Sequence, residues 1–396
     1  MNRMIYLDNA ATTPIRPEVF EAMKPYYLEE FANPSSVYTF AQRSRQAVEF
    51  ARSQLADMLH AKSGEIYFTT GGSEADNWAI KMLAEARKEK GKHIITLKIE
   101  HHAVLHTCQY LEKQGYEVTY LEVDENGLIS LEELKKSIRP DTILLSIMFA
   151  NNEIGTIEPV AEIGKIAREH GIVFHTDAVQ AFGHIPIDVE KMNIDALSAS
   201  GHKFNGPKGV GFLYLRNGIK MQPLIHGGAQ ERGKRAGTIN TPGIVGMGKA
   251  AELAKMQMEA RIEKETKLRD YFIQQIREKI PYVKLNGDEK KRLPNNVNIS
   301  FRFVEGESLL LMLDRAGVYA SSGSACTSGS LDPSHVLLAI GLPHEIAHGS
   351  LRMTLSEETT KEDVDYVVEQ LQNIIEKLRN ISPLYEDFLK GEQNNV

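Results

Sequence analysis

One lysine in this sequence lies in a setting that suits Schiff-base chemistry. Lys203 falls in residues 198–209, SASGHKFNGPKG, where hydroxyl, imidazole and glycine residues follow a buried-looking strand. A lysine amine attacks carbonyl groups only when it is unprotonated, and burial or nearby positive charge makes that form accessible near neutral pH. A lysine beside glycines is more often a solvated loop residue, so the interpretation depends on its partners elsewhere in the chain.

The second chemical signal is a cysteine among very small residues. Cys326 lies in residues 321–330, SSGSACTSGS, where almost no side chain can pack, so we expect a mobile loop with a nucleophilic thiol. Cys108, the only other cysteine, has apolar neighbours at helical spacing, and we assign it to packing. No cation flanks Cys326 in the sequence, so the fold or the bound substrate must supply any activation of its thiol.

Polar residues also follow several predicted strands. Ser73, in the run TTGGSE, begins a predicted helix, where its hydroxyl and the backbone amides can bind a phosphate group; a simple N-cap is the alternative. Asp177, in HTDAVQ, could keep a pyridinium nitrogen protonated or could cap a helix. Gln180 lies three positions further on and could reach a phenolic oxygen of the same ring.

The stretch EHHAVLH at residues 100–106 raises the question of a metal site. His102 and His106 share one face of a helix, but no glutamate lies between them as in zinc proteases. No carboxylate or cysteine is spaced to complete a ligand shell, so we expect no metal there. An imidazole stacked on a cofactor ring is the better interpretation for His101.

Three further segments have both a functional and a structural interpretation. The run NNEIG at residues 151–155 offers an amide for contact with a ring, or a turn asparagine. Arg352 lies in a strand-like run and could bind a substrate carboxylate bidentately, or form a structural ion pair. Residues 227–238 are glycine-rich and basic, which suits either a loop over a phosphate or a solvated surface loop.

The composition excludes several classes of function. The chain has 46 basic and 53 acidic residues, a net charge of −7 and no basic block, so we expect no nucleic-acid partner and no anionic membrane surface. Two cysteines among 396 residues exclude a disulfide framework and suit a reducing cytosol. No signal-like or membrane-spanning run is present, so we expect a cytoplasmic protein.

These residues need a scaffold, and the pattern predicts an α/β fold. Between residues 65 and 215, short β-branched or aromatic runs alternate with helical patterns, which indicates βαβ crossovers and a mostly parallel sheet covered by helices on both faces. In such sheets ligands bind at the carboxyl ends of the strands. The predicted strands include residues 66–68, 93–96, 118–121, 143–146 and 172–175, and the predicted helices include residues 74–90, 103–113 and 160–170.

A chain of 396 residues exceeds the usual size of a single core, so we expect two domains. Residues 241–278 predict one long helix that links the sheet to a second unit. Beyond this helix, the pattern changes to a smaller α+β unit. Its predicted elements are strands at 297–301 and 350–354 and helices at 305–316 and 360–379.

Taken together and in this order, these segments resemble the pyridoxal-phosphate-dependent cysteine desulfurases, the NifS/IscS-like branch of the class V aminotransferases. The resemblance runs from YLDNAATTP at residues 6–14 to the strand that holds Arg352, and the serine-rich cysteine loop is of the long, first-group form. It implies the pyridoxal-phosphate transferase fold (fold type I), with a mainly parallel seven-stranded sheet in a large domain over residues 16–259. Residues 1–15 and 260–396 would form the small domain, and the active sites would lie at the subunit interface of a homodimer.

The resemblance also implies roles for individual residues. Lys203 matches the residue that forms the Schiff base with pyridoxal phosphate, Asp177 matches the partner of the pyridine nitrogen, and Cys326 matches the persulfide-forming cysteine. The other matches are His101 as the ring-stacking acid–base residue, Gln180 at the phenolic oxygen, Gly72, Ser73, Ser200, His202 and the neighbouring subunit's Thr238 at the phosphate, and Asn152 and Arg352 at the substrate carboxylate, with Asn33 a weaker candidate.

The implied reaction converts L-cysteine to L-alanine and leaves sulfur on Cys326 as a persulfide. Acceptor proteins such as an iron–sulfur scaffold or a tRNA- or cofactor-thiolating enzyme would then take the sulfur. A selenocysteine lyase or a cysteine-sulfinate desulfinase would share the cofactor and Lys203 but need less from Cys326. A non-catalytic interaction protein with a relict cofactor pocket is a third interpretation, and the intact set of candidate residues argues against it.

Overall fold

The computed structural model describes residues 4–322 and 333–393 and is built around a seven-stranded sheet. The strand order is β2-β8-β7-β6-β5-β3-β4. β8 is antiparallel to both of its neighbours, and all other neighbouring pairs in this sheet are parallel. The strands are β2 (Ile66–Thr69), β3 (His93–Leu97), β4 (Glu117–Leu121), β5 (Thr142–Ser146), β6 (Val173–Asp177), β7 (Ala196–Ser200) and β8 (Gly211–Leu215). The predicted α/β fold with a mainly parallel seven-stranded sheet is confirmed.

The sheet is covered on both faces because its central strands are apolar on both sides. Ile94, Leu144 and Val173 pack on one face against α4 (Gly72–Glu85) and α5 (His102–Glu112). Their sequence neighbours Ile95, Leu145 and Phe174 pack on the other face against α3 (Thr39–Met58), α7 (Val160–Glu169) and the start of α9 (Thr241–Lys279).

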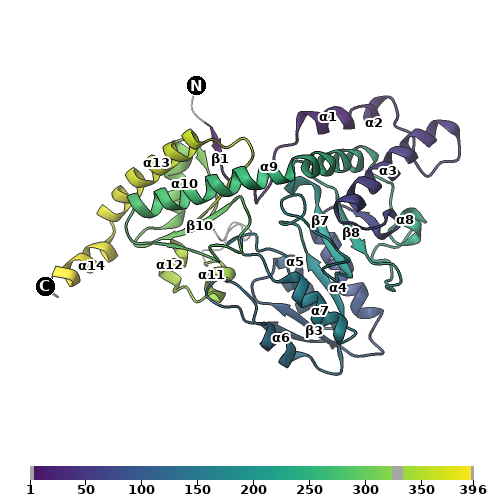
Figure 1. The fold of residues 1–396 in the computed structure, drawn as a ribbon, viewed down its shortest axis with the longest axis horizontal. Coiled ribbons are helices and arrows are strands. Elements are labelled where there is room, and N and C mark those ends of the chain that lie inside the picture. The colour runs from purple at the N-terminus through teal and green to yellow at the C-terminus, as the bar shows by residue number, and fades with distance from the viewer. Residues whose placement is uncertain (1–3, 323–332, 394–396) are drawn as a thin grey trace.

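Helix α9 joins this sheet to a second hydrophobic core. Its 39 residues extend over about 58 Å at the α-helical rise per residue. Ile244 and Met247 near its start pack on the large sheet, whereas Phe272 and Ile276 near its end pack in the second core. Figure 1 shows the helix crossing from one part of the molecule to the other. The long helix predicted over residues 241–278 is confirmed.

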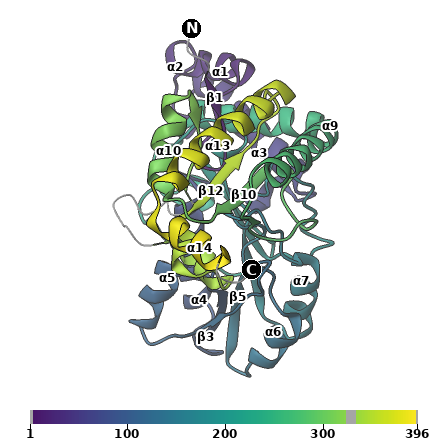
Figure 2. The same ribbon diagram turned by 90° about the vertical axis from the view of Figure 1, so that its left-hand side faces the viewer.

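The second core lies around a three-stranded antiparallel sheet and a short two-stranded parallel sheet. The first has the order β12-β10-β9 and the second pairs β1 with β11. Figure 2 shows α10 and α13 next to β10 and β12, with α14 further along the chain. These elements are β1 (Ile5–Tyr6), β9 (Val283–Leu285), β10 (Asn296–Phe301), β11 (Val318–Tyr319), β12 (Ser350–Thr354), α10 (Gly306–Arg315), α13 (Lys361–Asn380) and α14 (Pro383–Gln393). The predicted domain boundaries stay a prediction.

Several predicted elements are confirmed with shifted ends, and others were not predicted. Helix α4 covers residues 72–85 rather than 74–90, and the sequence analysis did not predict α3 at all. The remaining helices are α1 (Pro17–Met23), α2 (Pro25–Leu28), α6 (Leu131–Ser137), α8 (Gln230–Gly233), α11 (His335–Ala339) and α12 (His344–His348). Among the helices of the described residues, none has both the length and the apolar composition needed to cross a lipid bilayer.

Candidate active site

A cavity of about 240 Å³ lies at the carboxyl ends of the parallel strands, where ligands bind in open α/β sheets. Asp177 ends β6, Ser200 ends β7, and Arg352 reaches the cavity from β12 of the second core. The cavity thus lies between the seven-stranded sheet and the three-stranded sheet of the second core. It brings together ten of the residues that the sequence analysis singled out: Gly72, Ser73, His101, Asn152, Asp177, Gln180, Ser200, His202, Lys203 and Arg352.

Two other predicted residues, Asn33 and Thr238, are not among the described residues that line this cavity, and a third cannot be placed. Asn33 is exposed, and its side-chain oxygen accepts a hydrogen bond from the Ser35 amide (2.9 Å), so it closes its own turn. Thr238 is also exposed, and its predicted role places it at the site of a neighbouring subunit. Cys326 lies outside the described residues.

Lys203 ends a short 3₁₀ turn (Gly201–Lys203) that follows β7. Its Nζ donates hydrogen bonds to the backbone carbonyls of Ala10 (2.5 Å) and Ala11 (2.9 Å). His184 supports the turn from behind, with Nε2 2.9 Å from the Lys203 carbonyl oxygen. The amine is therefore held in the cavity by the N-terminal segment.

Two buried carboxyl groups lie in the wall of the cavity. Asp177 accepts a hydrogen bond from the Val179 amide (2.9 Å), and burial raises the pKa of its carboxyl to about 6. Asp76 of α4 is also buried, one of its oxygens has no hydrogen-bond partner, and burial together with Asp177 raises its pKa well above the usual range. Two acids in one buried site cannot both ionise cheaply, so this part of the cavity favours a cationic ligand.

The sequence analysis missed Asp76, although one signal was present. Asp76 lies one helical turn after Gly72, among the buried apolar residues Ala75 and Ala79 of α4. A charged residue on the buried face of a helix is rare unless it has a partner or a function.

The part of the cavity at the start of α4 has the features of a phosphate site. Helix α4 begins at Gly72 without a side-chain cap, which leaves its first backbone N–H groups available; Ser73 is inside the helix and is not the N-cap. A Cβ atom at Gly72 would come within 2.6 Å of Val179, so only glycine allows this close approach. An adjoining groove continues past Ser200 and His202 to Lys208, which adds a positive charge.

Two histidines contribute neutral rings. Burial lowers the pKa of His101 to about 4, and its Nδ1 accepts a hydrogen bond from the Ala103 amide (3.1 Å), so the ring proton lies on Nε2. Burial also lowers the pKa of His202 to about 4, and its Nδ1 lies 3.0 Å from the Thr12 hydroxyl. Gln180 donates from Nε2 to the Ala10 carbonyl (3.0 Å).

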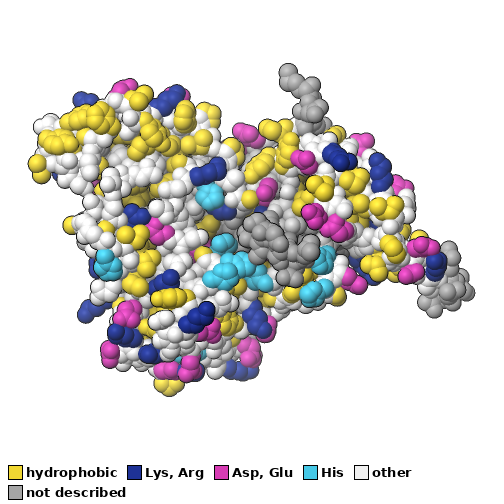
Figure 3. Space-filling view, turned by 180° about the vertical axis from the view of Figure 1, so that it is seen from behind, with side chains coloured by type: hydrophobic (Ala, Val, Ile, Leu, Met, Phe, Trp, Pro, Cys, Tyr) yellow, Lys and Arg dark blue, Asp and Glu magenta, His cyan; other side chains and the backbone are white. Residues whose placement is uncertain are grey.

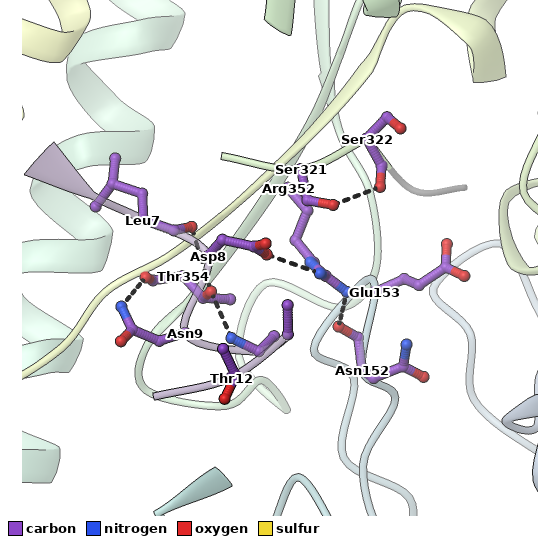
Figure 4. A network of polar contacts seen from close by, with 12 residues as sticks. Leu7, Asp8, Asn9, Thr12, Asn152, Glu153, Ser321, Ser322, Arg352 and Thr354 are labelled. Carbon is purple, nitrogen blue, oxygen red and sulfur yellow. Dashed lines mark hydrogen bonds and ion pairs between the residues drawn. The ribbon is translucent and has the colours of Figure 1, made fainter. Parts of the chain in front are cut away.

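Arg352 contributes to the cavity wall from the second core, and Figure 4 shows its contacts with Asp8 and Asn152. Its Nη2 forms an ion pair with Asp8 Oδ1 (2.9 Å), and its Nη1 donates to the backbone carbonyl of Asn152 (3.1 Å). Its Nε is buried and has no hydrogen-bond partner among residues 4–322 and 333–393. The guanidinium is therefore only partly satisfied, and it can still bind an anion.

The residues present fit pyridoxal phosphate. The acids Asp177 and Asp76 suit a protonated ring nitrogen, and the uncapped start of α4 suits a phosphate. The amine of Lys203 also faces the cavity, where it can react with an aldehyde.

The histidine pair considered for metal binding gains a third neighbour in the structure. The His102 ring lies 5.1 Å from that of His106 and 4.7 Å from that of His335, measured between ring centroids. In residues 4–322 and 333–393, no three or more histidine, cysteine, aspartate or glutamate side chains form a group able to hold a metal ion.

Comparison with known proteins places the chain in a well-populated group. Residues 5–367 match the aminotransferase class-V family model. The chain is 60% identical over 395 residues to the cysteine desulfurase IscS of Clostridium botulinum, covering 99% of this chain and 100% of the relative. It is similar to the solved structure of a NifS-like protein (TM-score 0.89, 38% identity, 94% of this chain and 100% of the other). It is also similar to that of SspA in complex with cysteine (TM-score 0.81, 42% identity, 90% and 100%).

Proposed function

Because this chain belongs to the aminotransferase class-V family and is a pyridoxal-phosphate-dependent cysteine desulfurase, we propose that Lys203 and Cys326 carry out its reaction on L-cysteine. The C–S bond of the substrate breaks, a new S–S bond forms on Cys326, and the carbon that lost sulfur gains a proton to give L-alanine. The observation that carries this proposal is the meeting of Lys203, Asp177 and the partly satisfied Arg352 in one cavity.

Residues of this chain provide the binding site for the cofactor. Lys203 would hold it covalently, Asp177 would bind its ring nitrogen, and Gly72, Ser73, Ser200 and His202 would bind its phosphate. When bound, pyridoxal phosphate supplies an aldehyde for the substrate amine and an electron-withdrawing ring. With the cofactor bound, Asp177 would keep a negative charge beside the ring nitrogen, in a buried site where water screens charges only weakly.

Arg352 is the proposed ligand of the substrate carboxylate. Its Nε lacks a partner in the described structure, and a carboxylate is the acceptor that a guanidinium fork fits best. Asn152 lies beside it in the cavity wall. Binding at this point would place the α-carbon of the substrate between Arg352 and Lys203.

Proton transfer is assigned to Lys203 and His101. The amine of Lys203, once released from the cofactor, can take the proton from the α-carbon of the substrate. His101 has a neutral ring with its proton on Nε2, which suits stacking and hydrogen-bond donation rather than a positive charge near the ring.

The persulfide on Cys326 would pass to acceptor proteins, which include an iron–sulfur scaffold or a thiolation enzyme in the cytoplasm.

A homodimer is also proposed. Exposed apolar side chains gather at α1, α2 and the start of α3, including Leu28 (83% exposed) and Val37 (94% exposed). Figure 3 shows yellow side chains over that end of the molecule. Patches of this kind are typical of interfaces, and we propose that the second subunit of the homodimer packs there.

Two substitutions test the proposal. Cys326→Ala should abolish alanine and sulfide production while the protein keeps its yellow bound cofactor, whereas Cys108→Ala, in the buried face of α5, should stay active. Lys203→Ala should lose the borohydride-reducible link to the cofactor. Full activity of Cys326→Ala, or a reducible link on another lysine, would reject the assigned roles.

A further inference from the structure

Asp8 is fixed next to Arg352 by the path of the N-terminal segment. After β1, the chain runs between β11 and β12, where the Leu7 amide donates to the Tyr319 carbonyl (2.7 Å) and the Leu7 carbonyl accepts from the Thr354 amide (2.6 Å). On the other side of Asp8, the Asn9 side chain donates to the Thr354 carbonyl (2.8 Å). Asp8 is thus held on both sides by hydrogen bonds to the strand that carries Arg352, as Figure 4 shows.

Asp8 contacts Arg352 from outside the cavity. Arg352 is part of the cavity wall, but Asp8 is not among the described residues that form it. The Asp8 side chain is 22% exposed, against 3% for Arg352, so the carboxylate lies toward solvent and the guanidinium lies inward. A substrate in the cavity would therefore meet Arg352 and not Asp8.

The contact leaves part of the guanidinium available. Asp8 uses one oxygen to accept from Nη2, and the Asn152 carbonyl accepts from Nη1, so two fixed acceptors set the plane of the group. Nε stays without a partner. A carboxylate that served only to neutralise Arg352 would gain most from a bidentate contact, which is absent between these two described residues.

We propose that Asp8 is a positioning residue: with the Asn152 carbonyl, it orients the Arg352 guanidinium so that Nε and the other available N–H groups face the carboxylate of the substrate. This inference rests on the proposed function of Arg352. It adds that Asp8, which is not part of the described cavity wall, determines selectivity for a substrate that carries a carboxylate.

The test compares Asp8→Ala, Asp8→Asn and a control, Asp141→Ala, as cofactor-loaded proteins. Asp141 also pairs with an arginine (Arg139, 2.6 Å), but at a distant edge of the sheet. Loss of a hydrogen bond to a charged group predicts that Asp8→Ala raises KM for L-cysteine by about tenfold or more, with kcat nearly unchanged. Asp8→Asn should restore most of the affinity, because its amide oxygen can still accept from Nη2.

Cysteamine, which is cysteine without the carboxylate, separates orientation of Arg352 from general damage. Its turnover should be the same in Asp8→Ala as in the unaltered enzyme, so the preference for L-cysteine falls about as much as KM rises. Equilibrium titration with L-alanine, followed by the absorbance of the bound cofactor, should show the same loss of affinity without any turnover. An unchanged KM in Asp8→Ala, or an equal loss for cysteamine, would overturn the proposal.

The variant Arg352→Gln distinguishes a failure of the proposed role of Arg352 from a failure of the inference about Asp8. If this variant retains the preference for L-cysteine over cysteamine, the proposed function of Arg352 fails. If Arg352→Gln loses the preference but Asp8→Ala keeps it, only the inference about Asp8 fails. Should Asp8→Ala not fold, Asp8→Glu, which keeps the charge but moves the oxygens, should have a higher KM than Asp8→Asn, and the reverse order would overturn the proposal.

Discussion

Two buried arginines in this molecule differ in how completely their donors are used. Arg52 of α3 and Arg352 of β12 each have a side chain that is only 3% exposed. Arg52 donates to both oxygens of Glu231 (2.8 and 2.9 Å), to the Ile66 carbonyl (2.9 Å) and to Glu49 (3.1 Å). Arg352 donates to one oxygen of Asp8 and to one backbone carbonyl, and its Nε has no partner among the described residues.

The difference separates a structural charge from a functional one. The guanidinium of Arg52 also lies 4.4 Å from the centre of the Phe68 ring, so both its edges and a face are occupied, and it has no capacity for a ligand. Arg352 keeps N–H donors that a ligand can use. Without the ligand, these buried donors lack the hydrogen bonds that would offset their removal from water. The same contrast holds for acids, because Glu231 has a cation as partner and Asp177 and Asp76 compete in one pocket.

The largest expected effect comes from breaking the satisfied pair. Arg52→Met leaves Glu231 buried without its cation, which should lower the free energy of unfolding by about 3–5 kcal/mol. KM for L-cysteine should stay the same in the protein that remains folded, because Arg52 does not line the cavity. Chemical denaturation and steady-state kinetics measure the two quantities.

A double variant, Arg52→Met with Glu231→Leu, is the control for this prediction. Replacing both charges with apolar residues of similar size should recover much of the lost stability, since no unpaired charge remains. A large rise in KM for the single variant would contradict the contrast between the two arginines.

Asp177→Asn should act in the opposite direction on stability and function. Loss of the charge beside the cofactor ring should lower kcat by about 10²–10³-fold, as for other removed electrostatic contacts in active sites. Above pH 6, however, the cofactor-free variant should be more stable than the parent by about 1–3 kcal/mol, because it no longer holds an ionised carboxylate in a buried site. Thermal unfolding of the cofactor-free proteins at pH 8 checks the prediction on stability, and single-turnover kinetics check the prediction on rate. Equal stability of Asp177→Asn and the parent would show that the Asp177 carboxylate does not destabilise the fold.

The periodic parts of the chain could be predicted from the sequence. The strands around β3, β5 and β6 and the long helix α9 follow from unbroken apolar runs and helical spacing, and their ends agree with the structure within about two residues. Helix α3 was missed because its buried face is carried largely by small residues such as Ala41 and Ala51, which give a weak apolar signal.

The site was predictable where residues follow strands or belong to a recognised motif, and not where two distant segments meet. Lys203, Asp177 and Ser200 follow or end strands, so their convergence in one cavity follows from the geometry of a parallel sheet. The contact of Asp8 with Arg352 joins residues 344 positions apart, and no local pattern contains it. Asp76 faces Asp177 only because α4 packs against β7 and β6.

The smallest expected effect concerns Glu158, a buried carboxyl that, unlike Glu231, forms no ion pair within the described part of the chain; the charge of Lys291 only partly offsets the effect of its burial. It accepts one hydrogen bond from the Ile129 amide (3.1 Å), its other oxygen has no partner, and burial raises its pKa from 4.5 to about 8. The folded protein therefore keeps a proton that the unfolded chain releases above pH 4.5, so this contribution to stability is complete at low pH and is lost as the pH rises through about 8. Between pH 7 and pH 8 the parent should lose about 1 kcal/mol that Glu158→Gln does not lose. Urea denaturation at the two pH values, with exposed Glu133→Gln as the matched variant, measures this difference. Identical pH dependence in the parent and Glu158→Gln would mean that burial without an ion pair does not make this carboxyl a pH-sensitive point in the fold.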